Sequence, residues 1–426
     1  MKKKLINFQE LLVYLLPIAL LSGNFIPDLV IVILGIIFLI NVDYRNERKY
    51  FYNYFFIFFI FFWIILIISS LQSEIPIYSL KTSLPYIRFA FFTLSVWYLI
   101  DNRANFINNF TLILIATFIL VIIDGYLQFF YGKSIFGYQY EGNRLLSLFS
   151  GKKIIGSYLS RLYPLMIALS LFVFFKNKKI TYLLLILFIS IDVLIFLSGE
   201  RTAFFNLILS TVFFILLISF SKKIRLFSVL ISFIIIIFIS VTDNSVKNRM
   251  INHTLDQINI TGNKGDSLYL FSEEHQNYYM ASLKMFYSNP LLGIGPKMYR
   301  HTCMDEDYHS VTKELPIVSS CNTHPHGTFF QLIAEVGIIG IAPYILAIFS
   351  ISYIFIKQFF EMLFRRRVSL SNYEICLLIT ITISLWPIIP SMQVFHNWIS
   401  IIYFLPVGFL LSYQYNKHIK TIKNNE

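Results

Sequence analysis

Long apolar stretches alternate with short polar segments along most of the chain. Each stretch is rich in Ile, Leu, Phe and Val and has the length that a helix needs to cross a bilayer. The pattern predicts about twelve membrane-spanning helices. We place them near residues 11–26, 28–41, 51–70, 84–100, 110–130, 154–175, 180–198, 203–220, 226–242, 327–356, 372–390 and 398–415.

One long polar segment, 243–325, interrupts this pattern late in the chain. Within it, residues 273–286 repeat apolar positions at helical spacing, which predicts an amphipathic helix. Asn289-Pro290 ends that helix, because proline cannot donate the next backbone hydrogen bond. The predicted organisation therefore has three parts: transmembrane helices over 1–242, a loop domain outside the membrane over 243–325, and the last transmembrane helices with a tail over 326–426.

Composition supports a membrane protein. The 426 residues are 57% hydrophobic and only 14% charged, whereas about one quarter of the residues of a soluble domain are charged. The 45 phenylalanines and the long aliphatic runs exceed what one soluble core of this size can bury. The fold class predicted is an all-α, polytopic integral membrane protein.

The net charge of +12 does not indicate nucleic acid as a partner, because most basic residues gather in short loops. With twelve spans, the basic loops 2–4, 45–49, 176–179, 222–225, 357–367 and 417–423 fall on one side, which the positive-inside rule assigns to the cytoplasm. Both termini are then cytoplasmic and the loop domain lies outside. The loop 131–153 is basic on the outer side, so we expect an anionic lipid or substrate beside it.

Two cysteines, Cys303 and Cys321, lie in the outer loop. In an oxidising compartment they can form a disulfide, which would close a loop of about nineteen residues and stabilise it by about 3 kcal/mol. The alternative is two free thiols. Four histidines lie in the same part of the chain: His301, His309, His324 and His326. Their spacing fits no compact zinc pattern, so we expect no metal.

Candidate chemistry gathers where the polar loop ends and the next apolar helix begins. Pro325 breaks any incoming helix, and His324, His326 and Thr328 cluster at the new helix start. Backbone N–H groups are unpaired there and the helix dipole is positive, which predicts an anion site with an imidazole at the membrane edge. The alternative is a pair of interfacial histidines without chemistry.

Charged residues inside predicted spans are costly to bury and are therefore candidates for function. Arg201 and Arg161 are both predicted at the outer level of His326, where a guanidinium could bind phosphate oxygens in bidentate fashion. Either arginine could instead snorkel to the interface or pair with a carboxylate such as Glu200. Glu335 follows His326 by two and a half turns, about 13 Å along the helix, so we expect it to contact a neighbouring helix.

Cationic groups and a histidine at the outer lipid level favour a lipid phosphate or pyrophosphate as ligand. Three segments then resemble the O-antigen ligase and polymerase superfamily of bacterial membrane glycosyltransferases. They are His326 with Glu335, Gly337 and Gly340; the turn Ser198-Gly-Glu-Arg-Thr-Ala203; and the loop Asn289-Pro-Leu-Leu-Gly-Ile-Gly-Pro-Lys-Met-Tyr-Arg300. The resemblance covers about residues 185–410.

The resemblance implies an inverting glycosyl transfer that needs neither metal nor cofactor, at the periplasmic face of the bacterial inner membrane. The donor would be a glycan on undecaprenyl pyrophosphate. The acceptor would be a sugar hydroxyl of the lipid A core in a ligase, or the growing glycan in a polymerase, and we favour the ligase. A transporter of lipid-linked glycans is the alternative from another class, but the two halves of the chain show no similarity to each other.

By position, the resemblance makes His326 the general base, with His324 as a rival, and makes Arg201 the pyrophosphate ligand. A second arginine from the loop serves the same end in the family. Arg300 is the first candidate for it and Arg249 the next, whereas Arg161 is a further candidate at the same level. The chain departs from the family pattern at two positions: His275 stands where many members carry a loop arginine, and Gly327 where Asn or Ser is usual.

Overall fold

The structure is a computed structural model that describes the whole chain except residues 1, 143, 175–177, 220–221, 259–270, 309–320, 366–367, 388 and 426. Every regular element among the described residues is a helix. The apolar helices are α1 Lys2–Ala19, α2 Phe25–Asn41, α3 Tyr54–Leu71, α5 Arg88–Asn102, α6 Phe106–Tyr131, α7 Ile155–Phe174, α8 Lys178–Leu197, α9 Arg201–Leu217, α10 Lys222–Thr242, α15 Thr328–Phe360, α16 Asn372–Ser384 and α17 Asn397–Asn425. The remaining α-helices are α4 Pro76–Ser83, α11 Asn244–Lys247, α12 His253–Ile258, α13 Glu273–Ser288 and α14 Tyr299–Thr302.

The helices support a polytopic membrane protein. Within the described residues, 8 helical segments are long and apolar enough to cross a membrane, and four shorter apolar helices accompany them. These segments lie at the predicted spans, but α2, α8, α9 and α16 are short for a full crossing, so the total of about twelve stays a prediction. The expected span over 372–390 was too long. Helix α16 ends at Ser384, shortly before Pro387, which cannot continue the helical hydrogen bonds.

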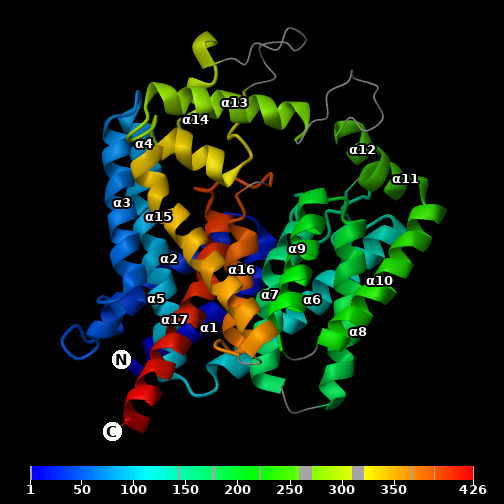
Figure 1. The fold of residues 1–426 in the computed structure, drawn as a ribbon, viewed down its shortest axis with the longest axis horizontal. Helices are drawn as coiled ribbons and strands as arrows, with labels where there is room; N and C mark the ends of the chain where they lie inside the picture. The colour runs from blue at the N-terminus through cyan, green and yellow to red at the C-terminus, as the bar shows by residue number, and fades with distance from the viewer. Residues whose placement is uncertain are drawn as a thin grey trace.

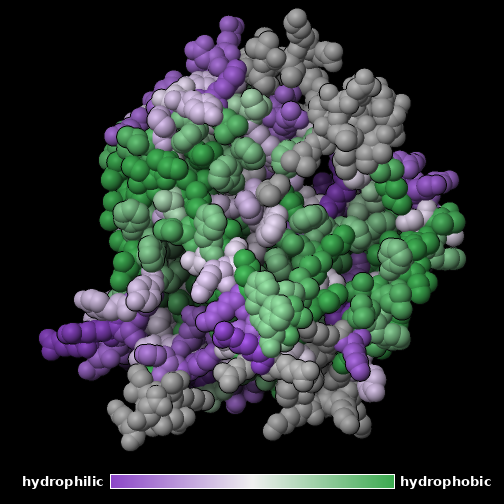
Figure 2. All heavy atoms as spheres, in the orientation of Figure 1, coloured by the Kyte–Doolittle hydropathy of each residue, from purple (hydrophilic) through white to green (hydrophobic). Residues whose placement is uncertain are grey.

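The apolar helices form a bundle, and helix α13 lies across the end of it that is opposite both chain termini (Figure 1). We call these the loop end and the termini end. The surface is hydrophobic in a belt across the middle and hydrophilic towards both ends (Figure 2). This distribution is what a bilayer around the middle of the bundle requires.

Helix α15 is broken where the loop motif that starts at Asn289 docks into it. Gly337, inside α15, has φ 62° and ψ −168°, which no helix allows. Four backbone hydrogen bonds join the loop to the break: Ile294 N–H to Ala334 O, Gly295 N–H to Glu335 O, Ile338 N–H to Pro290 O and Ile339 N–H to Leu291 O. The expected continuous helix over 327–356 is therefore wrong at Gly337, where the loop takes over the hydrogen bonds of the helix.

This interlock requires glycine on both sides. A Cβ atom on Gly293 would lie 2.5 Å from the carbonyl carbon of Glu335, and one on Gly337 would collide with the carbonyl oxygen of Leu291. The φ and ψ angles of Gly337 are also open only to glycine. The glycines that suggested a family motif thus have a physical role: they fix the loop on the helix that begins beside His326.

We expect Gly337→Ala to lower the free energy of unfolding by about 2–4 kcal/mol, because it adds both strain and a backbone collision. The matched control is Gly132→Ala, since Gly132 also has a positive φ, of 77°, but no atom within 4 Å of its Cβ position. Thermal unfolding in detergent, followed by size-exclusion chromatography, measures both. Equal melting temperatures for the two variants would contradict the interlock.

Candidate active site

Three histidine rings meet at the loop end of the bundle, where α15 begins. His324 and His326 lie in the segment that leads into α15, and their ring centroids are 4.0 Å apart. His275, from α13, places its ring centroid 5.6 Å from that of His326. The Tyr278 ring is 5.8 Å from His326 on the same side. The fold therefore brings together the predicted base, its rival and the histidine that departs from the family pattern.

The backbone of His326 is held in an unusual conformation. Its φ is +56°, a left-handed value that costs a non-glycine residue about 1–3 kcal/mol. Its carbonyl oxygen accepts a 2.7 Å hydrogen bond from the N–H of Ser391, in the connection between α16 and α17. The next residue, Gly327, has no room for a side chain, because a Cβ atom there would lie 2.8 Å from the Tyr279 ring. Packing against Tyr279 thus explains the glycine at this position.

Burial keeps the histidines uncharged. Burial, with the nearby His275 adding to its effect, lowers the pKa of His326 to about 4, although Glu274 acts in the opposite sense. Burial and the neighbouring His326 lower the pKa of His324 to about 3. Both rings are therefore neutral at neutral pH. A neutral imidazole can accept a proton, which is what a general base needs.

This state predicts a pH profile. The base works while His326 is neutral, so kcat/KM for a reaction that uses it should stay flat from pH 8 to about 5. It should fall as the pH approaches the lowered pKa of about 4, where the ring becomes protonated. Initial rates between pH 4 and 8 with purified protein test this. A midpoint near 6.5, the ordinary value of histidine, would contradict a buried base.

Three arginines gather around the turn between α8 and α9. Arg201 begins α9 and donates from Nη1 to the Gln257 amide oxygen. Arg249, in the π-helical turn Asn248–Asn252, donates from Nε to the Gly199 carbonyl at 3.2 Å. Arg144, from the connection between α6 and α7, has Nη2 3.6 Å from Glu200 Oε2. The charges of Arg144 and Arg249 both act on Arg201, and that of Arg201 acts on His275.

Glu200 does not neutralise Arg201. Its carboxylate accepts hydrogen bonds from the Gly156 N–H at 2.7 Å and from the Ser157 hydroxyl at 2.6 Å, and so caps the first turn of α7. Its remaining ion pair is with Arg144. The alternative that Glu200 pairs with Arg201 is thus wrong in this structure. Hydrophilic side chains lie in a recess between α12 and the start of α9 (Figure 2). The arginines form a positive site that suits an anion with several oxygens.

The other two predicted arginines lie elsewhere. Arg161 is 3% exposed and donates from Nη1 to the Ser384 carbonyl at 2.9 Å, so it joins α7 to α16. The charge of Arg300, on α14, acts on Lys297 and His324. The charges that act on Arg201 are instead those of Arg249 and Arg144. Arg249, the second candidate from the sequence, therefore accompanies Arg201. Arg144 was missed as a site residue, and its signal was the basic loop on the outer side.

Glu335 fastens the loop to the helix. Its carboxylate accepts from the Gln331 amide at 3.0 Å and from the Tyr299 N–H at 3.3 Å. We expected a partner on a neighbouring helix, and Tyr299 is the first residue of the short helix α14, which belongs to the docked loop. From the apolar helix α3, the Ser69 hydroxyl donates to the backbone carbonyl of Glu335. Gly340 lies one turn further and allows close packing, since a Cβ atom there would lie 3.3 Å from Ile65 of α3.

Cys303 and Cys321 form a disulfide with their Cα atoms 5.2 Å apart. The bond ties the end of α14, which carries Arg300, to the segment that leads to His324 and His326. Residues 309–320 within the closed loop, including the predicted His309, lie outside the described part of the chain. Among the residues that are described, no group of three or more His, Cys, Asp and Glu side chains is placed to hold a metal ion.

Residues 183–345 match the sequence model of the O-antigen ligase family. This match supports the O-antigen ligase and polymerase superfamily. The matched residues include Arg201, Arg249, His275 and His326. No curated protein matches the chain in sequence.

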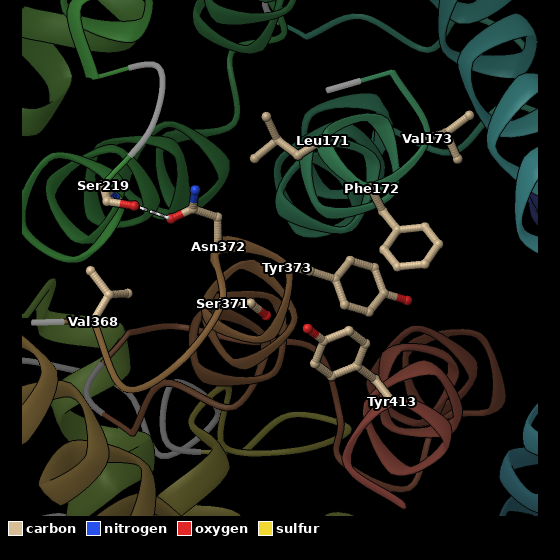
Figure 3. A pocket seen from close by; sticks show the side chains of 9 residues that line it. All are labelled: Leu171, Phe172, Val173, Ser219, Val368, Ser371, Asn372, Tyr373 and Tyr413. Carbon is tan, nitrogen blue, oxygen red and sulfur yellow. Dashed lines mark hydrogen bonds between the residues drawn. The ribbon is translucent and has the colours of Figure 1, made fainter. Parts of the chain in front are cut away.

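Arg144 and the Ser391 segment lie outside the matched residues, so only the fold connects them with the site. A separate cavity of about 590 Å³ lies at the termini end (Figure 3). It is lined by Leu171, Phe172, Val173, Ser219, Val368, Ser371, Asn372, Tyr373 and Tyr413. Its polar groups include Asn372, whose side-chain oxygen accepts from Ser219. This lining has no charged side chain, so the histidines and arginines remain the candidate site.

Proposed function

We propose that this protein transfers a glycan from undecaprenyl pyrophosphate to a sugar hydroxyl of the lipid A core. The observation that carries this proposal is the convergence of Arg201 and Arg249, which have no ion pair among the described residues, with a neutral, partly buried histidine at one end of a membrane bundle. His275 lies between the arginines and His326 in this network. Its ring is 5.6 Å from that of His326, and the charge of Arg201 acts on it. The match to the O-antigen ligase family supports the same reaction class.

In the proposed mechanism, His326 accepts the proton of the acceptor hydroxyl. The acceptor oxygen then bonds to the anomeric carbon of the donor, while the bond from that carbon to the pyrophosphate oxygen breaks. Attack opposite the leaving group inverts the configuration. Arg201 and Arg249 bind the pyrophosphate and offset the negative charge that develops on it as it leaves, so the step needs no metal.

The proposed setting is the bacterial inner membrane, with the loop end in the periplasm and both termini in the cytoplasm. The basic loops at the termini end support this orientation through the positive-inside rule. The polyprenyl tail would remain in the bilayer beside the apolar belt while its pyrophosphate meets the arginines. The disulfide at the loop end fits an oxidising compartment.

The polymerase of the same superfamily is the second candidate, since it would use the same donor and the same base. Lipopolysaccharide from a strain that lacks the gene, with and without the wild-type copy, separates them. A ligase predicts that the deletion leaves the core without polymer and lets lipid-linked polymer accumulate. Cores that carry a single repeat unit would instead indicate a polymerase. An unchanged ladder of bands would contradict both enzymes and return attention to a transporter.

A further inference from the structure

A second group of cationic side chains lies beside His324, apart from the arginine cluster. It consists of the cations Lys152, Lys297 and Arg300 together with the neutral ring of His396, and we call these four residues the second cationic group. We propose that this group binds an acidic substituent, a carboxylate or a phosphate, on the acceptor sugar. The inference rests on the proposed function and names the chemical class of its acceptor.

The docked loop fixes Lys297 in this position. Lys297 follows Pro296, and its backbone has a left-handed φ of +61°. Tyr299, two residues on, is tied by its N–H to the buried Glu335. Burial and the charge of Arg300 lower the pKa of Lys297. Among the described residues, the Lys297 ammonium forms no direct ion pair, although the more distant carboxylates of Glu335 and Asp28 act on it.

A chain of hydrogen bonds links Lys152 to His396. Lys152 Nζ donates to Asn24 Oδ1 at 3.1 Å, and Asn24 Nδ2 lies 3.1 Å from His396 Nε2. With its oxygen occupied, the Asn24 amide must donate to Nε2, so the proton of the neutral ring sits on Nδ1. That buried Nδ1 has no partner among the described residues. His396 therefore presents an N–H group with no acceptor.

Other buried nitrogens of this region are also unsatisfied. His324 Nε2 and Arg300 Nε have no hydrogen-bond partner among the described residues. A buried donor without an acceptor costs about 1–3 kcal/mol, so several together point to a ligand that supplies oxygen atoms. The carboxylates at hand are committed: Asp28 pairs with Arg88 at 2.9 Å, and Glu335 accepts from Tyr299 and Gln331.

The two cationic groups act on different histidines of the site. The arginine cluster acts on His275, which contacts His326. Arg300 and His396 act on His324, and Lys297 and Lys152 act on His396. In an inverting displacement the attacking oxygen approaches opposite the leaving group, so donor and acceptor must reach the base from different directions. The second cationic group therefore faces the acceptor.

Binding of small probes to the full-length protein in neutral-lipid nanodiscs tests this. The probes are glucuronate, glucose 6-phosphate, glucose and inorganic pyrophosphate, and the variants are Lys297→Gln and Arg201→Gln. We expect at least one of the acidic sugars to bind at least about tenfold more tightly than glucose, and Lys297→Gln to remove that difference. Pyrophosphate binding should fall with Arg201→Gln and stay unchanged with Lys297→Gln.

Lys152→Gln is a second variant at an exposed position that should fold normally, and it should weaken acidic-sugar binding in the same direction. Lys133→Gln is the matched control in the same connection and should change nothing. Equal binding of glucose and both acidic sugars would overturn the proposal. Displacement of the acidic sugars by nanodiscs that contain phosphatidylglycerol would also overturn it, in favour of a lipid headgroup. If Arg201→Gln left pyrophosphate binding unchanged, that result would instead count against the proposed function.

Discussion

Replacing His326 by asparagine is expected to lower glycan transfer by about 10²–10⁴-fold, the usual contribution of a general base. Asparagine is the informative substitution because it tolerates the left-handed φ of +56° that His326 adopts, whereas alanine would add strain. The loss should appear in kcat, with donor binding nearly unchanged, since the arginines are untouched. Single-turnover transfer with purified protein and a lipid-linked donor measures it.

His324 provides the sharpest comparison, because its ring lies 4.0 Å from that of His326 and it is the rival base. His324→Asn should cost less than His326→Asn if His326 carries the proton. His301, which is exposed and stacks edge-on against Tyr78 at 4.5 Å, is the matched control and should retain wild-type transfer when changed to asparagine. A larger loss from His324→Asn than from His326→Asn would exchange the roles of the two rings.

The sequence was sufficient for features that depend on local pattern. Hydrophobic length placed the apolar helices, and helical spacing placed α13, which the structure has at Glu273–Ser288. The helix start after Pro325 and the cysteine pair were also legible, because each depends on residue type within a short window. The match over 183–345 confirms the superfamily that the motifs indicated.

What the sequence did not reveal depends on contacts between distant segments. Arg225 was interpreted as a topological charge, but its Nη1 lies 2.7 Å from the Asp192 carboxylate inside the bundle. Ser391 supports the His326 carbonyl across 65 residues, and the insertion of the Asn289 loop into α15 breaks a helix that is mostly apolar. No single window contains both partners of such a contact, so periodicity alone could not predict them.

Replacing Arg201 by alanine is expected to lower kcat/KM for transfer by about 10²–10³-fold, because it removes a charged donor from the leaving pyrophosphate. Arg201→Lys should recover only part of the loss, since an ammonium keeps the charge but lacks the planar fork of a guanidinium. Arg201 is suited to this comparison because its hydrogen-bond partner among the described residues is the neutral Gln257 amide, so neither change leaves a carboxylate unpaired. Transfer from a lipid-linked donor, measured beside the exposed control Arg45→Ala, gives the ratio.

The double variant with Arg249→Ala decides whether the two guanidiniums act on one ligand. Arg249 donates to the carbonyl of Gly199, which lies two residues before Arg201, and the charge of Arg249 acts on Arg201. If both bind the same pyrophosphate, their effects should be coupled, and the double variant should lose less than the product of the single losses. Independent, multiplying effects would place the two arginines on different ligands. In that case Arg144, whose charge also acts on Arg201, becomes the better candidate for the second pyrophosphate contact.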